Sequence, residues 1–96
     1  MTSGGKGQLH NYTVKPGLEG WGYEDLGAAR LALIWWLDTH GQVDGTVYDM
    51  GKRIGVVKLT DNYWSWKATG DSAYYKIDPH TGSILTVRKN GRKKTN

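Results

Sequence analysis

The pattern of apolar and polar positions changes its period once along the chain. Between residues 23 and 40 the apolar side chains recur at helical spacing, and residues 31–37 form an unbroken apolar run with two adjacent tryptophans. Between residues 43 and 88 apolar and polar side chains alternate, as they do in strands with one buried face. The pattern therefore predicts one helix followed by a β-sheet.

Residues at both ends of the first segment favour a helix. Glu24 and Asp25 fall in its expected first turn, where carboxylates stabilise the positive end of the helix dipole. Gly41 follows the expected last turn and can adopt the left-handed conformation that commonly ends helices. We therefore predict a helix over about residues 23–40.

Short segments rich in Asp, Asn and Gly divide the alternating region into strands. Such residues favour the tight turns of β-hairpins, so successive strands are expected to be antiparallel. A short strand over residues 10–15 should end at Pro16. The predicted fold class is α+β: this N-terminal strand and one helix, packed on a five-stranded antiparallel meander over about residues 43–88. The strands of the meander are expected at residues 43–48, 53–60, 63–68, 72–78 and 83–88.

The length of 96 residues suits one domain with a modest core. We expect a flexible leader over residues 1–9, a single domain over residues 10–88 and a disordered basic tail over residues 89–96. Cysteine is absent, which excludes disulfides and thiolate metal sites. The longest apolar run has seven residues, against about 20 needed to cross a bilayer, so we expect a soluble, cytoplasmic protein without membrane contact.

The net charge of +4 comes from the end of the chain. Residues 1–87 contain eight basic and nine acidic side chains, so the body of the protein is close to neutral. The remaining basic side chains are Arg88, Lys89, Arg92, Lys93 and Lys94. A tail of this kind either attracts the phosphates of nucleic acid or only keeps the protein in solution, and both interpretations stay open.

The apolar surface of the predicted helix is wider than one sheet face requires. Packing on the sheet accounts for Leu33 and Trp36, and it leaves Leu31 and Trp35 on a second flank. Either the N-terminal segment over residues 12–21 covers this flank, or the flank is exposed to a partner. Exposed large apolar side chains are typical of a protein interface.

The first functional hypothesis is accordingly a small non-catalytic binding protein, of the accessory or inhibitor kind that bacteria and phages use. It is expected to recognise another protein, or a second copy of itself, through Leu31 and Trp35. This hypothesis depends on the helix flank alone and needs no cofactor.

The predicted strands support an alternative hypothesis, a nucleic-acid-binding module. Alternation places Tyr63 and Lys67 of one strand, and Tyr74 and Lys76 of the next, on the solvent face. Tyrosines stack on bases and lysines hold phosphates, so this face would act together with the basic tail. Tyrosine is also favoured in strands for packing alone, and Tyr and Lys neighbours are ordinary on a solvated sheet.

A third hypothesis is a small metal-independent ribonuclease in which His80 or His10 transfers protons. No spacing links these histidines to a carboxylate, and His80 between a proline and a glycine suits a turn. The sequence also lacks histidine pairs at metal-binding spacing and a phosphate-binding glycine loop. We therefore expect no catalytic activity, no metal, no cofactor and no small-molecule substrate.

Overall fold

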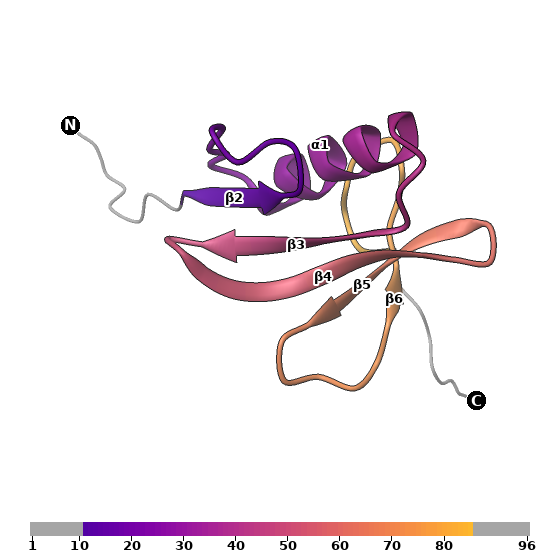
Figure 1. The fold of residues 1–96 in the computed structure, drawn as a ribbon. Coiled ribbons are helices and arrows are strands. Elements are labelled where there is room, and N and C mark those ends of the chain that lie inside the picture. Colours follow the sequence, from indigo (N-terminus) through magenta and orange to yellow (C-terminus); the bar gives the residue numbers. More distant parts are fainter. Residues whose placement is uncertain (1–10, 86–96) are drawn as a thin grey trace.

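The computed structural model describes residues 11–85. Helix α1 (Leu26–Thr39) packs on one face of a five-stranded antiparallel sheet (Figure 1), which confirms the predicted α+β fold. The predicted leader, the predicted tail, Arg88 and His10 lie outside the described residues. The strands follow one another across the sheet in chain order: β2 (Tyr12–Lys15), β3 (Asp44–Asp49), β4 (Lys52–Thr60), β5 (Tyr63–Ala68) and β6 (Tyr75–Lys76).

The N-terminal strand β2 forms one edge of this sheet. It pairs antiparallel with β3, so that Tyr12 lies opposite Asp49. The segment predicted as a strand over residues 83–88 contributes, in its described part, a bridge between Ile77 and Ile84. The sheet therefore reaches its five strands by including β2.

Helix α1 begins later than the sequence predicts. Tyr23 exchanges two backbone hydrogen bonds of 2.8 Å with Tyr12 and so belongs to the edge of the sheet. Asp25 is the N-cap, because its side chain accepts a hydrogen bond of 2.9 Å from the backbone N–H of Ala28. Glu24 consequently precedes the helix, and the prediction that both carboxylates lie in the first turn was wrong. An acidic side chain at the N-cap still satisfies one of the free N–H groups of the helix.

The far edge of the sheet is shorter than predicted and is closed by the chain itself. The carboxylate of Asp71 accepts a hydrogen bond of 3.1 Å from the N–H of Ala73, and this local turn delays the start of β6. After β6, the N–H of Leu85 donates to the carbonyl of Lys76 at 2.8 Å. The edge at Lys76 is therefore paired within the molecule.

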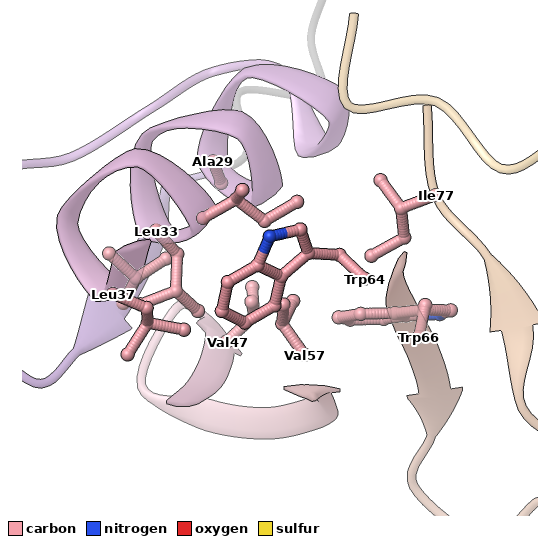
Figure 2. Packing of buried hydrophobic residues seen from close by; sticks show 10 residues of the cluster. Ala29, Leu33, Leu37, Val47, Val57, Trp64, Trp66 and Ile77 are labelled. Atoms are coloured by element: carbon pink, nitrogen blue, oxygen red, sulfur yellow. The ribbon is translucent and has the colours of Figure 1, made fainter. Parts of the chain in front are cut away.

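The hydrophobic core lies between α1 and the sheet (Figure 2). Leu33 and Leu37 of the helix point toward Val57 and the indole of Trp64. Gly41, with a φ of 68°, ends the helix in the left-handed conformation that the sequence predicts. The buried apolar residues are Val14, Ala29, Leu33, Ile34, Leu37, Val47, Val57, Trp64, Trp66 and Ile77. The described part of the chain contains no helix with the length and apolar character needed to cross a bilayer.

Candidate interaction surfaces

The two adjacent tryptophans of α1 have different surroundings. The N-terminal segment covers Trp36, because Gly17, with a φ of 90°, packs on the indole so closely that a Cβ would not fit. Trp35 points about 100° away around the helix, and 65% of its surface is exposed. Leu31, one turn earlier, is half-buried. The flank formed by Leu31 and Trp35 is therefore not covered by the N-terminal segment.

Leu31 and Trp35 line a surface groove with a volume of about 730 Å³. Helix α1 contributes most of its lining, and Trp64 of β5 and two residues of the turn after β6 (the 78–82 loop) contribute much of the rest. The lining residues are Tyr23, Ala28, Leu31, Ala32, Ile34, Trp35, Asp38, Trp64, Pro79 and His80. A concave and mainly apolar surface of this size can hold a large side chain of a partner.

The 78–82 loop is fixed against α1 by backbone contact and by hydrogen bonds. Gly27 and Gly82 touch, so that a Cβ on Gly82 would overlap the carbonyl group of Gly27. Arg30 Nη1 donates a hydrogen bond of 3.1 Å to the carbonyl of Gly82. Within the loop, the N–H of Gly82 donates to the carbonyl of Asp78 at 2.8 Å. Part of the groove lining is therefore preformed on a fixed backbone.

Arg30 is a buried cation behind this loop, with 8% of its surface exposed. Its guanidinium carbon lies 4.4 Å from the centroid of a Trp66 ring. Burial lowers the pKa of Arg30, and the Asp25 carboxylate and Tyr12 oppose that shift by favouring the charged form. Among the described residues, none accepts a hydrogen bond from its Nε. The geometry gives Arg30 a structural role, which is to join the loop, the helix and the sheet.

The groove contains few groups suited to catalysis. Its ionisable side chains are Asp38, His80 and the phenol of Tyr23. His40 lies at the helix C-cap, where its ring stacks on Trp36 with a centroid distance of 3.9 Å. Within residues 11–85, no three His, Cys, Asp or Glu side chains are arranged to hold a metal ion. Of the two histidines in the ribonuclease hypothesis, the structure places His80 at the groove and does not describe the other.

The opposite face of the sheet carries the predicted tyrosines and lysines. The ammonium group of Lys76 lies 5.3 Å from the centroid of the Tyr63 ring. Lys58, on the neighbouring strand, has its ammonium group 6.0 Å from the centroid of the Tyr74 ring. Lys67 lies two residues beyond Ser65 on β5, and the cross-strand partners of Ser65 are Lys58 and Lys76. The structure therefore brings the four predicted residues onto one face, and Lys58 lies beside them.

The same face of the sheet continues across β4 and β3 to the edge strand β2. The ammonium group of Lys15 lies 5.2 Å from the centroid of the Tyr48 ring. Arg53 is the cross-strand partner of Tyr48. We call this surface the outer face, and its residues are Lys15, Tyr48, Arg53, Lys58, Tyr63, Ser65, Lys67, Tyr74 and Lys76.

Charge is separated between the two sides of the molecule. Residues 11–85 contain seven basic and nine acidic side chains. Five of the seven basic side chains lie on the outer face, where Asp44 is the acidic neighbour, opposite Lys58. The opposite layer, which consists of α1 and the loop before it, carries Glu19, Glu24, Asp25 and Asp38 against the buried Arg30. The nearly neutral net charge of the body therefore conceals a basic face and an acidic face.

Comparison with known proteins does not identify a family for this chain. No protein-family model, no curated protein and no solved structure matches it. The functional inference is therefore drawn from the groove and the outer face.

Proposed function

We propose that the protein is a non-catalytic binding module whose groove receives an apolar side chain of another protein. The observation that carries this proposal is the exposed indole of Trp35 beside a groove that Leu31 also lines. Tryptophan is the residue type most enriched among the side chains that dominate binding energy at interfaces. Because α1 is packed on the core along its other side, little conformational entropy is lost when this surface binds.

The charge of the helix layer supports a partner with basic residues. Asp38 lines the groove, and Glu24 and Asp25 are exposed near the start of α1. Lysine or arginine on either side of the inserted side chain would complement these carboxylates and raise the association rate. The proposed ligand is therefore a segment of another protein with a large apolar residue between basic residues.

The proposal is tested by selection from a display library of random peptides, followed by calorimetric titration of the enriched sequences. We expect an apolar residue flanked by Lys or Arg. The variant Trp35→Ala should bind these peptides at least about 30-fold more weakly, as for a residue that dominates an interface. The matched control is Trp21→Ala, because Trp21 is 66% exposed and does not line the groove. It should bind within about twofold of the original protein.

Sedimentation of the full chain separates this proposal from self-association. A dimer that the Trp35→Ala substitution converts to a monomer would show that the groove serves a second copy, and the proposal of a different partner would be wrong. Equal affinity of the selected peptides for the Trp35→Ala and Trp21→Ala variants would also contradict the proposal that the groove binds another protein.

A further inference from the structure

We propose that the outer face of the sheet binds single-stranded nucleic acid. This site lies on the opposite side of the sheet from the groove, and it does not rest on the proposed function. Its charge complements a phosphate chain, because five basic side chains share the face with the carboxylate of Asp44. Neutralisation of phosphates by such groups drives sequence-independent binding to nucleic acid.

The pairing of lysine with tyrosine determines which form of nucleic acid fits. Each of the rings of Tyr48, Tyr63 and Tyr74 has a lysine ammonium group within 6.0 Å of its centroid. An exposed cation–π contact is weaker than the stacking of a base on an aromatic ring. A base can therefore take the place of the ammonium group over the ring, and the released lysine remains close enough to contact the adjoining phosphate.

An unpaired base is required for this exchange. In a duplex the faces of the bases are occupied by their neighbours, whereas a single strand can present them to aromatic side chains. Within residues 11–85, the outer face carries no helix that could enter the major groove, since α1 lies on the other side of the sheet (Figure 1). Single strands are therefore the preferred ligand.

Ser65 is a small residue at the centre of the outer face, between two lysines on the adjoining strands. It is fully buried although it lies on the solvent side of β5. Its hydroxyl donates to the carbonyl of Lys58 at 3.0 Å and lies 3.1 Å from the hydroxyl of Thr60. The two lysines opposite Ser65, Lys58 and Lys76, therefore flank a small residue on adjoining strands. This row places positive charge on both sides of Ser65 in a fixed register.

The test measures fluorescence anisotropy of labelled oligo(dT) and oligo(U) of about 12 nucleotides, with the full chain and over a range of salt concentrations. The double variant Lys58→Gln/Lys76→Gln should bind at least tenfold more weakly. Its plot of log affinity against log salt should be shallower by about 1.4, because each lost contact with a single strand contributes roughly 0.7. Tyr74→Ala should weaken binding and leave this slope unchanged. The two oligonucleotides distinguish DNA from RNA as the preferred ligand.

Matched controls separate the outer face from other basic residues. Lys52→Gln removes the lysine that begins β4 opposite Asp49, outside the row that contains Ser65, and should bind like the original protein. A full-length variant, the tail variant, has glutamine at Arg88 and at the four basic positions of the predicted tail, and its binding should still depend on Tyr74 and Lys76. Trp35→Ala should also leave oligonucleotide binding unchanged, because Trp35 lies on α1.

Several outcomes would overturn the proposal. It is wrong if the Lys58→Gln/Lys76→Gln variant binds oligonucleotides as well as Lys52→Gln does, or if the tail variant loses all binding. It is also wrong if a duplex of the same length, or vesicles that contain phosphatidylserine, bind at least as tightly as the single strands. NMR amide shifts on titration provide a second measurement, because they should change on the strands that carry the outer face, which include β3, β4, β5 and β6, and not along the exposed side of α1.

Discussion

The backbones of Gly27 on α1 and Gly82 in the 78–82 loop touch, and Arg30 donates a hydrogen bond to the carbonyl of Gly82 beside this contact. The contact positions Pro79 and His80, which line the groove. Glycine at position 82 is therefore required for the groove as well as for the fold, because a Cβ there would overlap the carbonyl group of Gly27.

Substitution of Gly82 by alanine should strongly destabilise the protein. The φ of 78° costs about 1–2 kcal/mol for a residue with a Cβ, and the overlap with Gly27 adds about 1–3 kcal/mol. Urea denaturation should show a loss of about 2–5 kcal/mol in the free energy of unfolding. Gly70→Ala is the control, because Gly70 has a φ of 89° and no atom within 4 Å of the added Cβ. Equal losses for the two variants would contradict the importance of the contact.

Removal of the Trp35 side chain should hardly change stability, although the residue is large and apolar. Its indole is 65% exposed, so Trp35→Ala should change the free energy of unfolding by less than about 0.5 kcal/mol. Leu33→Ala, on the buried side of the same helix, should lower it by about 2–5 kcal/mol. Chemical denaturation of both variants checks this difference. A loss for Trp35→Ala that approaches the loss for Leu33→Ala would mean that Trp35 supports the fold, which its exposure argues against.

Asp25 should contribute to stability through its position as the N-cap. Asp25→Ala removes the acceptor for the N–H of Ala28 and should cost about 1 kcal/mol, measured by thermal or urea unfolding. Asp25→Asn should retain most of the stability because an amide oxygen also caps a helix. Glu24→Ala is the control, since Glu24 precedes the helix and should change stability by less than about 0.5 kcal/mol. A larger effect at Glu24 than at Asp25 would place the start of the helix earlier.

Arg30 should tolerate an apolar replacement of similar length. Burial disfavours its charge, and its packing on Trp66 depends largely on the length of the side chain. Arg30→Met should therefore change the free energy of unfolding by less than about 1 kcal/mol, whereas Arg30→Ala should lower it by about 2–4 kcal/mol through the lost packing. Denaturant unfolding compares the two variants. A loss for the methionine variant as large as that for alanine would show that the hydrogen bond to Gly82 is the dominant contribution.

The sequence predicts the elements whose signals are local. The helical period identifies α1, and the Asp- and Gly-rich segments identify the turns between the strands. The ends of the elements are less well predicted, because side chains such as those of Asp25 and Asp71 form local hydrogen bonds that shorten the helix and β6. Alternation along residues 63–68 also places Trp64 and Trp66 together on the side of the strand opposite Tyr63 and Lys67, and both tryptophans are buried in the core. These successes depend on contacts between residues that are close in the sequence or on one strand.

The sequence pattern indicates both candidate surfaces, but the exposure of Trp35 and the full extent of the outer face depend on contacts between distant residues. The sequence leaves Trp35 either covered or exposed, and the choice is made by Gly17, which lies on Trp36 instead. Counting charge along the chain predicts a neutral body. Alternation places Lys67 and Lys76 on the solvent face, and the cross-strand register shows that Lys58 and Lys76 lie on either side of Ser65 there. Alternation of side chains along β4 also places Lys58 on this face.

Each edge of the sheet is paired within the molecule at one position, and this limits how the protein can associate there. The backbone of Tyr12 on β2 is already bonded to Tyr23, and that of Lys76 on β6 is bonded to Leu85. A strand from another chain therefore cannot add to the sheet at these positions. Such strand addition is one way in which proteins bind peptides, and it is also a route to aggregation. Association at those positions must therefore use the side chains of the two faces, and it can be altered by surface substitutions that leave the backbone pairing intact.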